Sequence, residues 1–105
     1  MKVRPVRIEG DVAYIMLTRG YEAVIDAADV SLVDKFNWHA KPDQRTVYAI
    51  RTAVHDGSKH TFLLHRVLLN APDSLQVDHK DGDGLNNRRS SNLRVATQSQ
   101  NQHNR

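Results

Sequence analysis

Hydrophobic and polar residues alternate over short stretches in the first half of the chain, a pattern that predicts β-strands. Four such strands are expected, at residues 12–17, 21–25, 37–40 and 47–54. The first two flank a turn-sized gap that contains Gly20, so they are predicted to form a hairpin. Between the second and third strands, apolar positions recur at helical spacing. This predicts a short helix from an N-cap at Asp26 to about Phe36.

The second half of the chain predicts two further strands and two helical segments. Residues 61–69 begin extended and are expected to end as a helix before Pro72, because a proline disfavours helical backbone in the residue that precedes it. Strands are predicted at 75–79 and near 93–96. A capping box that begins at Thr97 then predicts a closing helix.

Length and composition fit one compact domain built from two parts. The chain has 105 residues, of which 39% are hydrophobic and 26% are charged. We expect an α+β fold with an N-terminal β-rich lobe at residues 1–62 and a smaller C-terminal unit at residues 63–105. No stretch approaches the roughly 18 apolar residues that span a bilayer, and no secretion signal is expected. Cysteine is absent, so disulfides are excluded and the cytoplasm is the expected compartment.

The charge balance of the chain is mildly basic. It has 15 Lys and Arg residues against 12 Asp and Glu residues, which gives a formal net charge of +3. Such a charge is compatible with a polyanionic partner. Taken alone it does not separate a nucleic-acid-binding protein from other small basic proteins.

An Asp-His pair in the last third of the chain indicates the chemistry most strongly. Asp78 and His79 fall on a predicted strand, where neighbouring side chains point to opposite faces. Asn92 follows within an Asn-Leu-Arg segment, and Asn101 lies in the predicted closing helix. A carboxylate, an imidazole and two amides can together hold a hard metal ion and activate a water molecule. The set therefore predicts a metal-dependent phosphodiesterase.

These residues, in this order, resemble the motif of the HNH endonucleases, particularly the small phage-type and homing-type members. The Asp-Gly-Asp-Gly turn at 81–84 and the Leu-Asn-Asn-Arg segment at 85–88 are also similar to that family. The resemblance runs from about Leu63 to Asn104. It implies that the C-terminal unit adopts the ββα-metal fold of two strands and a helix around one divalent metal ion.

The resemblance implies a role for each residue of the motif. His79 is the expected general base, and Asn92 is expected to bind the His79 ring or its backbone neighbours and so orient the imidazole. Asp78 and Asn101 are the expected metal ligands, and their oxygen atoms favour Mg²⁺ or Mn²⁺ over Zn²⁺. His103 is an alternative ligand to Asn101. The two residues are two positions apart on a helix and cannot easily face one ion.

Double-stranded DNA is the partner that the resemblance implies. One active site per chain and no visible dimerisation segment predict a monomer that nicks one strand, and the small surface outside the motif predicts low sequence specificity. Five basic residues in or beside the motif are expected to contact phosphates: Arg66, Lys80, Arg88, Arg89 and Arg94. The stretch that contains Trp38, Tyr48 and Arg51 is loosely similar to small three-stranded DNA-binding sheets. The alternative is that these aromatic residues belong to the core.

Other functions fit parts of the sequence. A catalytically silent DNA-binding module and an HNH nuclease that acts on structured RNA both remain open at this point. The acidic turn at 81–84 lacks the Gly and Glu positions of an EF-hand loop, so calcium sensing is not expected. His65 is predicted to be structural, and the remaining histidines outside the motif are predicted to lie on the surface: His39, His55 and His60.

Overall fold

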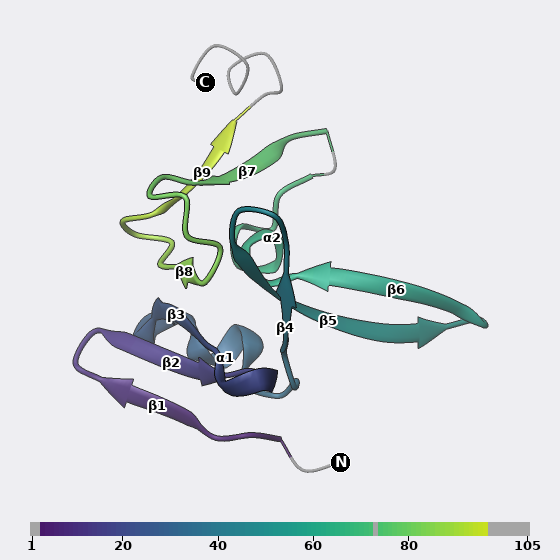
Figure 1. Ribbon diagram of the computed structural model, residues 1–105, viewed down its shortest axis with the longest axis horizontal. Coiled ribbons are helices and arrows are strands. Elements are labelled where there is room, and N and C mark those ends of the chain that lie inside the picture. Colours follow the sequence, from purple (N-terminus) through teal and green to yellow (C-terminus); the bar gives the residue numbers. More distant parts are fainter. Residues whose placement is uncertain (1–2, 73, 97–105) are drawn as a thin grey trace.

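The computed structural model describes residues 3–72 and 74–96, and the α+β prediction is confirmed (Figure 1). Three small sheets surround the short helix α2, which contacts strands of two of them. The strands are β1 (Val6–Glu9), β2 (Val12–Met16), β3 (Glu22–Asp26), β4 (His39–Pro42), β5 (Val47–His55), β6 (Ser58–Leu63), β7 (Gln76–His79), β8 (Asn86–Asn87) and β9 (Leu93–Ala96). The helices are η1 (Thr18–Gly20), η2 (Ala27–Asp29), α1 (Val30–Val33) and α2 (Leu64–Leu69). No helix of the described residues is long and apolar enough to cross a membrane.

The first sheet contains four strands in the order β1-β2-β3-β8. Strands β2 and β3 form the predicted hairpin, with Tyr14 opposite Val24. Their alternation gives the sheet one buried face, on which Ile15 and Ile25 are almost completely enclosed. Strand β8 joins the far edge of this sheet in parallel to β3, so a two-residue strand from the C-terminal part completes a sheet of the N-terminal part.

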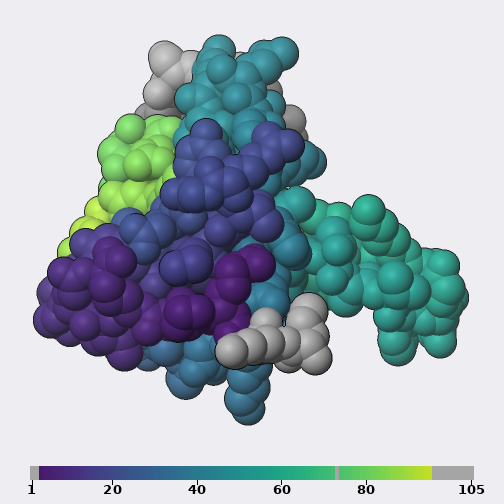
Figure 2. Space-filling model, turned by 60° about the horizontal axis from the view of Figure 1, so that its bottom comes forward, coloured from purple at the N-terminus to yellow at the C-terminus, as the bar shows by residue number. Residues whose placement is uncertain are grey.

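The second sheet is antiparallel and has the order β4-β5-β6. Strand β5 follows the predicted boundaries closely, and β6 runs directly into α2 as predicted. The outer half of the β5–β6 hairpin extends away from the body of the protein as an arm, drawn in teal in Figure 2. We call residues 52–61 the arm. Most of its side chains are exposed, so it buries little against the rest of the chain.

The third sheet is the antiparallel pair β7–β9, in which Asp78 lies opposite Arg94 and His79 lies opposite Leu93. These are the two strands that the ββα-metal prediction requires. The predicted closing helix, which begins at Thr97, lies outside the described residues. The strand part of the predicted motif is therefore present, and its helix stays a prediction.

One hydrophobic core joins the two parts of the chain. Trp38 is fully enclosed at its centre, and its Nε1–H donates to the carbonyl of Val33 at 3.1 Å. Leu64 and Leu68 of α2 and Leu93 of β9 belong to the same cluster. The alternative that Trp38 is a core residue is thus confirmed, and its ring is not available to bind DNA.

Three sequence predictions need correction. The helix predicted to reach Phe36 is only the 3₁₀ turn η2 followed by the single turn of α1, and its N-cap side chain makes no capping hydrogen bond. Asp26 instead accepts hydrogen bonds from Ser90 and Arg88, which are far away in sequence. Strand β4 begins two residues later than predicted, and strands β1 and β8 were not predicted at all.

Asp26 makes the stability of the fold depend on pH. Burial disfavours its charge, but hydrogen bonds from the backbone and hydroxyl of Ser90 and from Arg88 outweigh burial and lower the pKa below its ordinary value of 3.8. A carboxylate with a lowered pKa contributes stability above its unfolded pKa, and this contribution is lost as the pH falls through the folded pKa. We expect Asp26→Asn to lower the free energy of unfolding at neutral pH by about 1–3 kcal/mol.

Below about pH 4, the free energy of unfolding of Asp26→Asn should fall less steeply with decreasing pH than that of the wild type, because the titrating carboxyl group is absent. Urea unfolding of both proteins at neutral and acidic pH measures the difference. Asp56→Asn is the matched control, since this carboxylate at the tip of the arm is almost fully exposed. Equal acid destabilisation of wild type and Asp26→Asn would contradict the assignment.

Candidate functional site

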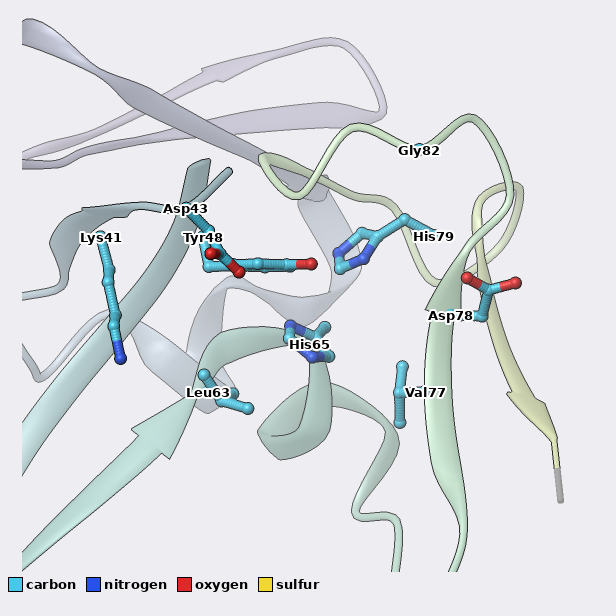
Figure 3. Close-up of a pocket in the computed structure, with 9 residues that line it drawn as sticks. All are labelled: Lys41, Asp43, Tyr48, Leu63, His65, Val77, Asp78, His79 and Gly82. Atoms are coloured by element: carbon cyan, nitrogen blue, oxygen red, sulfur yellow. The ribbon is translucent and has the colours of Figure 1, made fainter. Parts of the chain in front are cut away.

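His79 ends strand β7 and lies at the inner end of a pocket of about 370 Å³ between the second and third sheets (Figure 3). Its side chain is 8% exposed. The Nε2 atom lies 2.9 Å from Oδ1 of Asn87, which is itself fully buried. The Nδ2 group of Asn87 donates to the carbonyl of Gly84 at 3.2 Å, and this contact orients Oδ1 toward the ring as an acceptor. The proton of neutral His79 therefore belongs on Nε2, and Nδ1 keeps a free lone pair.

Asn92 forms hydrogen bonds with the backbone that follows His79 and not with the His79 ring. Its Oδ1 accepts the backbone N–H of Asp81 at 3.1 Å, and its Nδ2 donates to Asp81 Oδ1 and to the carbonyl of Asn86. Its own carbonyl accepts the N–H of Lys80 at 2.9 Å. Asn92 thus holds the backbone that follows His79, which is one of the two contacts that the sequence analysis allowed, while Asn87 holds the ring.

The acidic turn after His79 is organised by its own carboxylates. Asp81 Oδ1 accepts the backbone N–H of Asp83, and Asp81 Oδ2 accepts the amide of Asn86. The hydrogen bond from the Asp83 backbone lowers the pKa of Asp81, burial raises it, and the amides of Asn86 and Asn92 lower it further, so that the pKa lies below its ordinary value. Asp83 in turn accepts the N–H of Leu85 at 3.0 Å. These oxygens brace the loop through hydrogen bonds within it.

Asp78 and His79 point to different sides of β7, as the strand geometry predicts (Figure 3). The Asp78 carboxylate is 41% exposed and pairs with Arg94 across the β7–β9 hairpin, with 2.5 Å between Oδ2 and Nη2. It also lines the pocket that holds His79. A half-exposed carboxylate and a buried imidazole therefore lie at the same pocket.

The residues present fit a divalent metal ion as far as the described chain reaches. The Asp78 carboxylate is a hard oxygen donor of the kind that Mg²⁺ and Mn²⁺ prefer. Within residues 3–72 and 74–96, no group of three or more His, Cys, Asp or Glu side chains comes together as a metal site. The predicted second ligand, Asn101 or alternatively His103, lies outside the described residues, so Asp78 is the one predicted ligand that the described residues contain.

Two of the predicted DNA-binding arginines join the two parts of the protein. Arg88 Nε binds Asp26 at 2.9 Å, and its Nη2 reaches Asp11 at 3.3 Å. Arg89 pairs with the buried carboxylate of Asp29 at 2.5 Å. Both guanidinium groups therefore have acidic partners inside the chain. Contact of either residue with DNA stays a prediction.

The other predicted DNA contacts lie around the site in different environments. Lys80 is exposed on the loop after His79. Arg66 lies half-buried on α2 and donates to the carbonyl of Pro72 at 2.8 Å. Arg94 pairs with Asp78, as described above. Of the predicted residues that the structure describes, Asp78, His79 and Asn92 are therefore brought together with Lys80 and Arg94 on one hairpin and its loop.

Asn87 and the pocket wall were missed by sequence reasoning. The wall consists of Tyr48 on β5 and His65 on α2, whose ring centroids lie 5.9 and 4.7 Å from that of His79. Nothing local in the sequence relates these residues to the Asp-His pair. Asn87 could have been suspected, because it lies in the segment that resembles the family motif.

Gly84 allows the loop to pack against β5. A Cβ atom at this position would lie 2.5 Å from the carbonyl oxygen of Val47 and 2.8 Å from Cδ1 of Tyr48. We expect Gly84→Ala to lower the free energy of unfolding by about 1–3 kcal/mol, since backbone has to move. It should also displace Tyr48 from His79. Urea unfolding and activity per folded molecule measure the two effects.

The control for Gly84→Ala is Gly10→Ala. Gly10 has a φ of +64° in the turn between β1 and β2, and a Cβ there meets nothing within 4 Å. That variant should lose roughly 1–2 kcal/mol through backbone strain alone and keep its activity per folded molecule. Equal behaviour of the two variants would show that the contact of Gly84 with β5 does not shape the site.

A buried imidazole with one free nitrogen beside an exposed carboxylate has the chemistry of a hydrolase that activates water. Residues 70–103 match the sequence profile of the family described as HNH endonuclease. The resemblance predicted from the motif is therefore confirmed for this segment, which covers about a third of the chain. A search of curated proteins and a search of solved structures gave no match to the chain.

Proposed function

We propose that the protein is a metal-dependent endonuclease that hydrolyses phosphodiester bonds in double-stranded DNA, with His79 as its general base. The observation that carries this proposal is the hydrogen bond from His79 Nε2 to Asn87, which leaves Nδ1 free in a pocket within the segment that matches the HNH family. A nuclease needs a base at this point because water is a poor nucleophile until a proton is removed.

His79 performs proton transfer in the proposed mechanism. Its Nδ1 takes a proton from the attacking water, and the ring becomes an imidazolium. Asn87 accepts the Nε2–H throughout, which fixes the ring and stabilises the charge that forms on it. Asn92 keeps the following backbone in place through Asp81.

Asp78 is the proposed metal ligand on the described part of the chain, and Asn101, or alternatively His103, is the proposed second ligand. A bound Mg²⁺ or Mn²⁺ ion supplies positive charge for the phosphate oxygens and for the leaving oxygen. Arg94 lies beside Asp78 and supplies a further positive charge next to the phosphate. Oxygen donors favour these two ions over Zn²⁺.

The second sheet and its arm form the proposed DNA-binding surface outside the motif. An antiparallel two-stranded ribbon has the dimensions that the DNA major groove admits. The exposed arm contains the basic side chains of Lys59 and His60 and one carboxylate, that of Asp56. Such a short element has little surface for reading a long target, so we propose low sequence specificity. Because the chain has one HNH motif, we also propose that each monomer cuts one strand.

Supercoiled plasmid incubated with Mg²⁺, Mn²⁺, Zn²⁺ or EDTA tests the proposal. We expect open-circular plasmid to accumulate before linear plasmid with Mg²⁺ or Mn²⁺, and no change with EDTA. Linear product that forms without an open-circular precursor would contradict nicking by a monomer. The Asp78→Ala variant should bind Mn²⁺ more weakly in a direct titration, whatever its activity.

The same assay separates the two alternatives. Retardation of DNA on a gel without cleavage under any metal condition would favour a catalytically silent DNA-binding module. Faster cleavage of a structured RNA than of duplex DNA would favour an RNA substrate. Both substrates share the phosphodiester chemistry proposed for His79, so only a direct comparison of rates distinguishes them.

A further inference from the structure

His65 is a buried histidine that the proposed mechanism does not use. It is the second residue of α2 and is 6% exposed. Its Nδ1 atom is enclosed and has no hydrogen-bond partner among residues 3–72 and 74–96. A buried polar atom without a partner costs roughly 1–3 kcal/mol, so an apolar ring would pack at this position with less penalty. Core packing alone therefore does not account for a histidine here.

His65 lies in the wall of the pocket that His79 and Asp78 also line. The His65 and His79 rings meet edge to face, with 4.7 Å between their centroids and 70° between their planes. Tyr48 closes the other side of His65, with 5.7 Å between the ring centroids. Figure 3 shows the three rings around the same space, with Lys41 at its other end. A ligand that reaches His79 through this pocket passes His65.

His65 is neutral at physiological pH. Burial lowers its pKa, and the charges of His79 and Arg66 lower it further, to about 4. A neutral imidazole carries one N–H and one lone pair. Placing the proton on Nε2 leaves only a lone pair on the enclosed Nδ1, so Nε2–H is the donor that remains for a ligand.

We infer that His65 is a substrate-contacting residue whose Nε2–H donates a hydrogen bond to a non-bridging oxygen of the phosphodiester held beside His79. This inference rests on the proposed function, because it assigns the phosphate to the same pocket. A neutral donor stabilises the negative charge that develops on the phosphate without repelling the proton that His79 takes up. The inference adds a substrate contact to the structural role that the sequence analysis predicts for His65.

Two substitutions of His65 separate a phosphate contact from a packing role. His65→Phe keeps a ring and removes both nitrogen atoms, and His65→Gln places an amide donor near the position of Nε2. We expect His65→Phe to have an unchanged or higher melting temperature and a kcat/KM for DNA cleavage reduced by roughly 10- to 100-fold. His65→Gln should recover part of that loss.

Two outcomes of the substitutions would overturn the inference. Wild-type activity of His65→Phe would show that the ring nitrogens are not needed. A fall in melting temperature that accounts for the lost activity in both variants would show that His65 is structural.

A binding measurement keeps this test separate from the proposed nuclease function. Thymidine 3′,5′-bisphosphate, added without metal to ¹⁵N-labelled protein, should shift the ring nitrogen signals of His65, and His65→Phe should bind this probe several-fold more weakly. If the wild type cuts no nucleic acid but the probe shifts His65, the nuclease proposal fails and the phosphate contact stands. If the His65 signals do not move at saturating probe, the inference is wrong.

Discussion

Replacing His79 by Ala is expected to reduce DNA cleavage by roughly 10²- to 10⁴-fold, the range that a general base contributes. The structure gives the reason, because Asn87 holds Nε2 and leaves Nδ1 as the proton acceptor in the pocket. No other imidazole of the described chain can replace it. His65, the nearest ring, has its own Nδ1 enclosed. DNA binding should change little, since His79 is buried and contributes almost no surface.

The measurement pairs plasmid cleavage with metal-free gel retardation for wild type and His79→Ala. His39→Ala is the matched control, because His39 is an exposed histidine on β4 that does not line the pocket. It should cleave like the wild type. Loss of binding in proportion to the loss of cleavage would contradict the role of a base. A melting temperature for each protein shows whether the cavity left by the ring unfolds the site.

Asn87→Ala is expected to reduce cleavage by about 10- to 100-fold, as changes to groups that orient a functional histidine commonly do. Asn87 makes the described hydrogen bond to the His79 ring, and its amide is locked by the carbonyl of Gly84. Without it, the imidazole can carry its proton on either nitrogen and can rotate. Protein stability should fall as well, because Asn87 is fully buried.

Long-range ¹H–¹⁵N NMR of the His79 ring measures this effect independently of activity. Wild type should show one neutral tautomer with the proton on Nε2, and Asn87→Ala should show a mixture. Asn92→Ala is the informative comparison, because Asn92 contacts Asp81 instead of the ring. It should destabilise the loop and keep the tautomer. If Asn92→Ala showed a mixture of His79 tautomers and Asn87→Ala showed a single tautomer, Asn92 and not Asn87 would be the residue that orients the ring.

The sequence predicted those features whose cause is local. The β2–β3 hairpin follows from alternation around a short gap that contains Gly20, and β5 follows from a long apolar run. The split between Asp78 and His79 follows from the two-residue period of a strand. The family motif was confirmed for the same reason, because all of its residues lie within one short segment.

Features that depend on distant contacts could not be predicted in this way. Asp26 has the local appearance of an N-cap, but Ser90 and Arg88 compete for its carboxylate once the chain has folded. Strand β8 contains only Asn86 and Asn87, residues with low strand propensity, and exists because the edge of β3 is available to it. The partner of the His79 ring was missed for the same reason, since Asn87 is placed by that pairing.

The pairing of β8 with β3 has a consequence for the order of events during synthesis. Chains fold from the N-terminus as they leave the ribosome. Residues 22–26 leave the ribosome well before residues 86–87, so β3 can already be folded when Asn87 emerges and β8 pairs with its edge. His79 therefore gains its hydrogen-bond partner only after residue 87 has left the ribosome. A nascent chain that has not yet exposed residue 87 is expected to carry the His79 ring without the amide that orients it.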